Sequence, residues 1–282
     1  MIIVTGASGQ LGRLVIAKLL KTTPAAQIVA AVRDVAKAAD LAAQGVQVRR
    51  ADYTDPASLD AAFQGATRLL LISSNDLGRR VAQHRNVIDA AVRARVALLA
   101  YTSVLHADRS TLALAAEHRE TEDAVRASGL NYSLLRNGWY VENYTGGLGG
   151  AIAHGALAGA AAEGRIAAAA RAEYAEAAAV VLASAGPVER IYELAGDTAF
   201  TLGELAAEVS RQTGKPLPFH QLTQQEYLDM LLGLGLPAAL AELLADSDAQ
   251  AAKGALDDNS GVLGKLIGRP TISLAAAVKA AL

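Results

Sequence analysis

The sequence of 282 residues predicts an α/β protein built on a doubly wound parallel sheet, and three observations support this. The chain opens with an apolar, β-branched run at residues 2–4, then a glycine-rich turn, then a helical pattern. Strand-like and helical patterns alternate with short connections as far as residue 137. Beyond that point helical patterns dominate, which predicts a smaller, mostly helical C-terminal part.

The opening turn carries glycines at positions 6, 9 and 12, a spacing that suits a dinucleotide-binding fold. Gly6 can adopt a positive φ, Gly9 lets the backbone approach a diphosphate, and Gly12 lets the helix pack closely on the sheet. The helix start also offers unpaired N–H groups to phosphates. A purely structural turn is the alternative. The residues expected to bind the cofactor here are Gly6, Ala7, Ser8, Gly9, Gln10, Leu11 and Gly12.

Five further strands are predicted at residues 27–32, 46–51, 68–72, 97–102 and 132–135. Helices are predicted between them, at about residues 11–19, 34–41, 55–64, 79–95 and 113–128. Asp34 and Asp55 are the expected N-caps, and Pro56 suits a first helical turn. Because ligands bind at the carboxyl ends of parallel strands, the residues after each strand are the candidate site residues.

In the C-terminal part, seven glycines between residues 146 and 164 predict a flexible segment. Helices follow at residues 171–184, 201–213, 224–234, 238–244 and 274–282, and a late strand at 190–194. We therefore expect a cofactor-binding domain over residues 1–145, with its sheet completed by residues 186–196, and a substrate-binding lid over residues 146–282.

The composition of the chain indicates which partners and which cell compartment to expect. The net charge is −2 and there is no basic run, which argues against nucleic acid. There are no cysteines, which excludes disulfides and thiolate chemistry and favours a reducing cytosol. The chain enters its first strand at once, without a signal peptide, and its alanine-rich tract is too polar to span a bilayer. We expect a cytoplasmic protein without a membrane span, and the sequence leaves open a homo-oligomer.

Charged and polar residues follow the predicted strands. Arg33 ends the second strand, where a guanidinium suits the 2′-phosphate of NADP, although a solvated surface arginine is the alternative. Asp52 and Tyr53 follow the third strand, where they could contact the adenine or be ordinary loop residues. Small polar groups near the diphosphate and the nicotinamide ribose are expected at Ser73, Ser74, Asn75, Thr102 and Ser103.

Several segments carry a resemblance to a known family. They are TGASGQLG at residues 5–12, LRNGWY at residues 135–140, and residues 51–53, 69–74, 83–87, 100–103, 192–197 and 265–268. The chain resembles the NmrA-like, atypical branch of the short-chain dehydrogenases (a Rossmann fold), above all its bacterial quinone reductases, with dye reductases next. By that resemblance NADP(H) would contact residues 6–11, Arg33, Ser73–Asn75 and the run Asn137, Gly138, Trp139, Tyr140, Val141 and Glu142.

The Tyr-x-x-x-Lys pair of typical short-chain dehydrogenases is missing, since the corresponding helix reads EHRETE at residues 117–122. That argues against an alcohol dehydrogenase. A quinone tolerates the absence, because hydride addition gives a phenolate-like anion, and phenols have a pKa near 10. Catalysis would then depend on holding the nicotinamide against the quinone.

The candidates for that task follow the sixth strand. Asn137 could hold the nicotinamide carboxamide, while Trp139 and Tyr140 offer flat surfaces to an aromatic substrate; a core Trp beside a surface Tyr is the alternative. The catalytic residue is undetermined, with Asn137 and Tyr140 the best candidates. Tyr144 is a further substrate candidate and Arg171 a further cofactor candidate.

The remaining histidines give weaker signals. His118 reads as a helix-surface residue, with proton relay the alternative, and His84 and His106 have no partner visible in sequence. No metal-ligand cluster is predicted. We expect an NADPH-dependent reductase that transfers hydride to quinones and also to aromatic dyes. A catalytically silent NADP(H)-binding redox sensor that signals through a partner protein is the alternative.

Overall fold

The computed structural model describes residues 1–282, and the chain forms two compact units, which we describe separately. The first unit comprises Met1–Ala107, Ala116–Asn137 and Arg171–Glu193. The second comprises Asp108–Ala115, Gly138–Ala170 and Leu194–Leu282. The division between cofactor-binding and substrate-binding domains at residue 145 stays a prediction.

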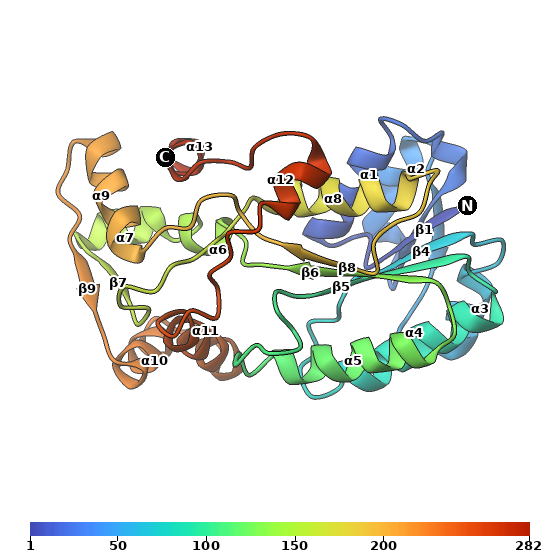
Figure 1. The fold of residues 1–282 in the computed structure, drawn as a ribbon, viewed down its shortest axis with the longest axis horizontal. Helices are drawn as coiled ribbons and strands as arrows, with labels where there is room; N and C mark the ends of the chain where they lie inside the picture. The colour runs from blue at the N-terminus through green and yellow to red at the C-terminus, as the bar shows by residue number, and fades with distance from the viewer. The chain divides into compact units, whose positions relative to one another are not determined.

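The first unit is built on a seven-stranded sheet with the order β3-β2-β1-β4-β5-β6-β8 (Figure 1). The strands are β1 (Ile2–Thr5), β2 (Ile28–Val32), β3 (Gln47–Arg50), β4 (Arg68–Leu71), β5 (Leu98–Val104), β6 (Tyr132–Asn137) and β8 (Ile191–Leu194). All pairings among β1 to β6 are parallel. The predicted α/β fold with a parallel sheet is confirmed.

Helices cover both faces of this sheet, with α4 and α5 on one face and α1 and α8 on the other (Figure 1). The helices of the unit are α1 (Gln10–Leu19), α2 (Ala39–Ala43), α3 (Pro56–Ala62), α4 (Arg80–Arg93), α5 (Ala115–Ala127) and α8 (Arg171–Ala183). The predicted caps are confirmed: Asp34 accepts a hydrogen bond from the Ala36 amide, and Asp55 accepts one from the Ser58 amide.

The core of the first unit lies between the sheet and helices α3 to α5. Phe63 and Val87 are fully buried there with Ile3, Leu69 and Leu99 of the sheet. Strand β2 is buried along its whole length, as its continuous apolar sequence predicts for a central parallel strand. This packing fixes the carboxyl ends of the strands, from which the candidate site is built.

The second unit is mostly helical, with a two-stranded parallel sheet of β7 (Leu157–Gly159) and β9 (Phe219–Gln221). Its helices are α6 (Glu142–Thr145), α7 (Leu148–His154), α9 (Leu202–Thr213), α10 (Gln224–Gly233), α11 (Ala238–Ala251), α12 (Val262–Ile267) and α13 (Leu274–Ala281). Thr201 caps α9 in a capping box with Glu204. None of the helices combines the length and the apolar composition that a membrane span requires.

The prediction of a flexible segment over residues 146–164 is wrong, because the segment contains α7 and β7. Some of its glycines serve capping or close packing. Gly155, at φ 78°, ends α7 in the left-handed conformation. A Cβ at Gly159 would lie 2.5 Å from Leu202 Cδ1 and 2.9 Å from Asp248 Oδ2, so close packing requires a glycine there.

Candidate cofactor-binding site

The order of the strands places a candidate site beside β1. The chain runs from β1 outward through β2 and β3, and then returns to the other side of β1 with β4. In such sheets ligands bind where the strand order reverses, at the carboxyl ends. The loops that follow β1 and β4 therefore flank the expected site.

The loop after β1 is the predicted glycine turn. Gly6 has a φ of 58°, a conformation that other residues rarely adopt, and the Gly9 amide donates to the Gly6 carbonyl at 3.0 Å. A Cβ at Gly12 would lie 2.6 Å from the Gly6 oxygen and 2.7 Å from Ala7 Cα. Gly12 is therefore the point where α1 packs against its own entry turn.

The N-terminus of α1 faces this turn. Gly9, the N-cap residue, provides no side-chain acceptor for the first-turn amides. Uncapped amides together with the helix dipole favour a bound anion. Arg13 supports the turn from α1, since its Nε donates to the Ser8 carbonyl at 3.0 Å and its guanidinium also pairs with Asp40.

A polar contact lies beneath the turn. The Tyr53 hydroxyl is 2.5 Å from Thr5 Oγ1 and 2.8 Å from the Ile72 carbonyl oxygen, and burial raises its pKa. Tyr53 therefore links the ends of β1 and β4 to the loop after β3. Its predicted stacking on an adenine stays a prediction.

Arg33 lies exposed directly after β2. Asp52, after β3, accepts hydrogen bonds from the Thr54 amide and hydroxyl, which are the main cause of its lowered pKa; the positive charges of Arg33 and Arg50 lower it further. The structure thus gives Asp52 a partner within its own loop. The 2′-phosphate contact of Arg33 and the adenine contact of Asp52 stay predictions.

The loop after β4 begins with Ser73, Ser74 and Asn75. The Ser73 amide donates to Thr102 Oγ1 at 2.9 Å, and the Ser74 amide donates to His84 Nε2 at 2.9 Å. Thr102 is only 3% exposed, so it supports the loop from below. Ser103 is also buried and donates to Glu122 at 2.7 Å, so both hydroxyls have partners within the protein, and their expected place near the diphosphate and the nicotinamide ribose stays a prediction.

The prediction that His118 lies on a helix surface is wrong. Its side chain is 5% exposed, and Nδ1 is 2.7 Å from the Tyr101 hydroxyl. The amphipathic face of α5 turns this histidine toward β5. Burial, helped by the charge of Arg80, lowers the pKa of His118 well below its usual value. His118 is therefore neutral at physiological pH.

Asn137, the last residue of β6, has the side-chain atom most suited to bind a ligand group. The residue is 7% exposed, and its Oδ1 is buried without a hydrogen-bond partner in the protein. An unpaired buried acceptor is costly, so a donor from a ligand would stabilise it. With the glycine turn and the uncapped start of α1, this atom makes the first unit fit a dinucleotide that carries a carboxamide.

The aromatic candidates belong to the second unit. Trp139, Tyr140 and Tyr144 are each half-buried. The Trp139 carbonyl accepts from the Ala169 amide at 3.2 Å, and the Tyr144 ring stands edge-on to Phe200 at 5.7 Å. These contacts hold the segment of α6 in place. Arg171, the first residue of α8, is half-buried in the first unit.

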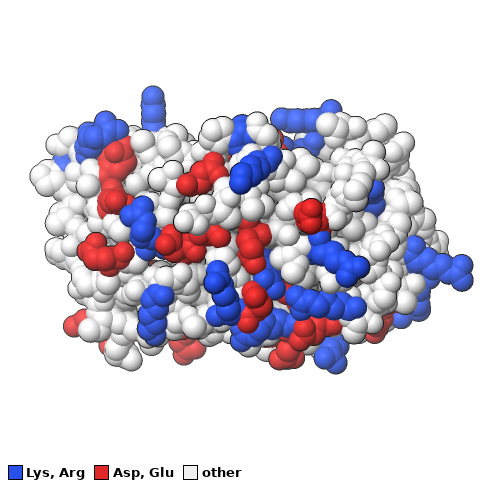
Figure 2. Space-filling model, viewed as in Figure 1, with Lys and Arg blue, Asp and Glu red and all other residues white.

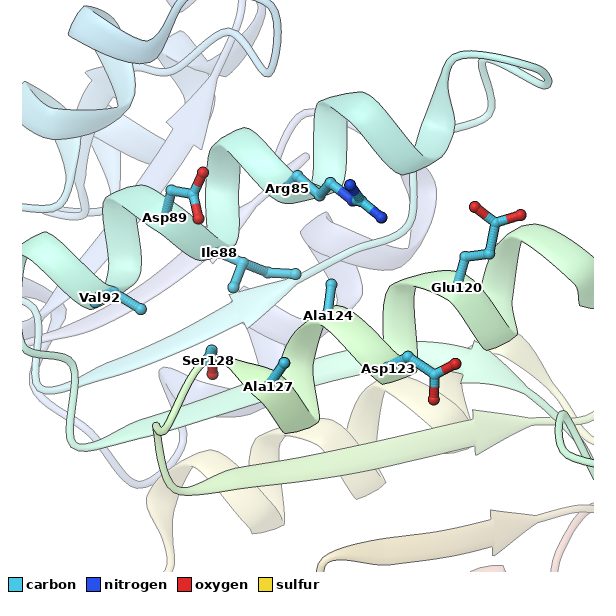
Figure 3. A pocket seen from close by; sticks show the side chains of 9 residues that line it. All are labelled: Arg85, Ile88, Asp89, Val92, Glu120, Asp123, Ala124, Ala127 and Ser128. Carbon is cyan, nitrogen blue, oxygen red and sulfur yellow. The ribbon is translucent and has the colours of Figure 1, made fainter.

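A groove between α4 and α5 contains none of the predicted site residues (Figure 3). It is lined by Arg85, Ile88, Asp89, Val92, Glu120, Asp123, Ala124, Ala127 and Ser128. These side chains lie between α4 and α5, whereas the strand-end site residues of the first unit lie at or after the carboxyl ends of the strands.

Comparison with known proteins identifies the family. Residues 1–267 match the family model described as "NmrA-like family". The chain belongs to the NmrA-like family. It is 55% identical over 278 residues to quinone oxidoreductase 2 of Escherichia coli K12, which covers 99% of this chain and 97% of that protein.

Solved structures of the family agree. An NADPH-dependent quinone oxidoreductase of Escherichia coli, complexed with NADPH, matches with a TM-score of 0.97 at 55% identity, covering 99% of each chain. The triphenylmethane reductase of Citrobacter sp., complexed with NADP(H), matches with a TM-score of 0.96 at 39% identity, covering 100% of both chains. The predicted resemblance to quinone-reducing and dye-reducing members is confirmed.

Proposed function

We propose that this chain is an NADPH-dependent reductase that transfers hydride to a quinone, and that it also accepts aromatic dyes. The observation that carries the proposal is the 55% identity to quinone oxidoreductase 2 over nearly the full length of both chains. The 39% identity to a triphenylmethane reductase supports the dye substrates. The redox-sensor alternative has no comparable support among these relatives.

The residues of the first unit would bind and orient the cofactor, which supplies the hydride when bound. The glycine turn and the start of α1 would hold the diphosphate, and Arg33 would pair with the 2′-phosphate. Asn137 Oδ1 would accept a hydrogen bond from the carboxamide, because it is buried and otherwise unpaired. That bond would fix which face of the nicotinamide ring is presented.

The residues of the second unit would bind the acceptor. Trp139, Tyr140 and Tyr144 offer aromatic rings in a chain of which only 4% of residues are aromatic. A quinone needs no strong acid, because the reduced oxygen is a phenolate that water can protonate. We assign residues 1–145 to cofactor binding and residues 146–282 to substrate binding, with these three aromatic residues, at the end of the first range, also contacting the acceptor.

The proposed partners are small molecules. On the face drawn in Figure 2, Lys and Arg side chains lie interspersed with Asp and Glu side chains. A cytoplasmic location, a homo-oligomer and the lack of a nucleic-acid partner stay predictions.

The test is the loss of NADPH absorbance when a simple benzoquinone is added. We expect saturable turnover, and we expect Asn137→Ala to lower kcat by about 10- to 100-fold by releasing the carboxamide. Asn131→Ala, at an exposed asparagine before β6, is the matched control and should keep full activity. Tight NADPH binding without turnover of any quinone or dye would favour the sensor instead.

A further inference from the structure

A buried histidine lies under the loop after β4, one of the two loops that flank the cofactor site. His84 on α4 is fully buried, and its Nε2 accepts a hydrogen bond from the Ser74 amide at 2.9 Å. Its Nδ1 is 3.0 Å from Thr121 Oγ1 on α5. The imidazole therefore joins the loop to both helices on one face of the sheet.

The surrounding bonds determine which nitrogen carries the proton. The Thr121 hydroxyl donates its hydrogen to the Glu117 carbonyl at 2.9 Å, so toward His84 it can only accept. His84 Nδ1 is therefore the protonated nitrogen, and Nε2 carries the lone pair that the Ser74 amide needs. Each donor from the Ser74 amide through His84 and Thr121 to the Glu117 carbonyl therefore has an acceptor.

The histidine is held in its neutral form. Burial, together with the positive charge of Arg80, lowers the pKa of His84 to about 3. Arg80 in turn lies 3.7 Å from the Glu117 carboxylate, which also accepts a hydrogen bond from the Gly78 amide at 3.0 Å. Because an imidazolium has no free lone pair, only neutral His84 can accept from Ser74.

Other bonds fix the same residue from α4. Arg80 Nε donates to the Ser74 carbonyl at 2.7 Å, and the Ser74 hydroxyl donates to Gln83 Oε1 at 2.5 Å. The backbone of Ser74 is thus bound at both its amide and its carbonyl. Without His84 the amide would be the one group of this residue left without its partner.

We propose that His84 is a positioning residue for the cofactor: it holds Ser73, Ser74 and Asn75 in the conformation that binds NADPH. This inference rests on the proposed function, since it takes these three residues as cofactor contacts. His84 itself needs no contact with NADPH. Its removal should weaken cofactor binding while the chemical step at saturating NADPH stays nearly unchanged.

The experiment compares His84→Leu, His84→Gln and a control, His118→Leu. His118 is also a buried histidine of this unit, but it bonds Tyr101 and no loop group. For His84→Leu we expect the Kd and KM of NADPH to rise about 10-fold, with kcat changed by less than about 2-fold. The glutamine amide can accept at the position of Nε2, so His84→Gln should restore most of the affinity.

The control separates positioning from general stability. His118→Leu should lower the melting temperature and leave the Kd of NADPH unchanged. If His84→Leu does the same, the proposal is overturned. If His84→Leu does not fold, Thr121→Val serves, because it removes the acceptor of His84 Nδ1, and the other bond it loses, to the Glu117 carbonyl, lies within α5. An unchanged Kd in that variant overturns the proposal too. Failure of the proposed function would instead appear in the wild-type protein, as absent turnover.

Discussion

The two loops beside the cofactor site keep their shapes by different means. The turn after β1 is shaped by its own backbone, through the positive φ of Gly6 and the contact of Gly12 with the Gly6 carbonyl. The loop after β4 is held by side chains of α4 and α5, above all His84 and Thr121. One loop depends on the absence of side chains, and the other depends on their presence.

This difference predicts how each loop responds to substitution. In the glycine turn an added methyl group meets backbone atoms, which cannot move aside without shifting α1. In the loop after β4 the loss of one side chain leaves one backbone group unpaired, while Arg80 and Gln83 still hold Ser74. Changes in the turn should therefore be more severe than changes beneath the loop.

The largest effect is expected for Gly12→Ala. The new Cβ would lie 2.6 Å from the Gly6 oxygen, so α1 and the turn must separate. We expect NADPH affinity to fall by about 100-fold or more, with a lower melting temperature. Gly149→Ala is the matched control, because a Cβ there meets nothing within 4 Å. Near-normal NADPH binding by Gly12→Ala would contradict the backbone account of the turn.

The next effect concerns a residue outside both loops. Arg33→Ala should raise the KM of NADPH by about 30-fold and leave the KM of NADH nearly unchanged, because only NADPH carries the 2′-phosphate. Steady-state kinetics with both cofactors measure the ratio. Arg50→Ala is the control, since Arg50 is an exposed arginine that ends the neighbouring strand and pairs with Asp55. Equal effects of Arg33→Ala on the KM of NADPH and of NADH would contradict the proposed contact between Arg33 and the 2′-phosphate.

The same contrast explains what could be predicted from the sequence. The glycine turn, the alternating elements and the caps at Asp34 and Asp55 are local patterns, so they could be identified without a structure. The partners of His84 could not, because Ser74 and Thr121 are 10 and 37 residues away in the chain. On an amphipathic helix, the sequence does not distinguish a buried histidine from an exposed one. For this reason the sequence predicts His118 on the helix surface, although it is buried.

Glycine was also the source of the wrong prediction over residues 146–164. A glycine gives the same signal whether it provides flexibility or lets two elements approach closely. Gly159 belongs to the second group, because Leu202 and Asp248 occupy the space a side chain would need. Only the packing of α9 and α11 against β7 distinguishes the two cases.

The smallest expected effect concerns the second unit, where a buried side chain also accepts a hydrogen bond from a backbone amide. Asp248 on α11 is 6% exposed and accepts a hydrogen bond from the Ala160 amide at 2.8 Å, as His84 does from Ser74. Unlike neutral His84, this acceptor can ionise within the working pH range. Burial raises the pKa of Asp248 to about 6, although the Ala160 bond opposes that rise.

The raised pKa sets the sign of the pH dependence. The folded state prefers the protonated carboxyl, so the stability this group contributes is complete below the unfolded pKa of about 4 and is lost as pH rises through about 6. Asp248→Asn stays neutral at every pH. It should match the wild type near pH 4 and be more stable by about 2 kcal/mol near pH 8, without a change in the KM of NADPH. Melting temperatures at the two pH values measure this, and an equal difference at both would mean that folding does not raise the pKa of Asp248.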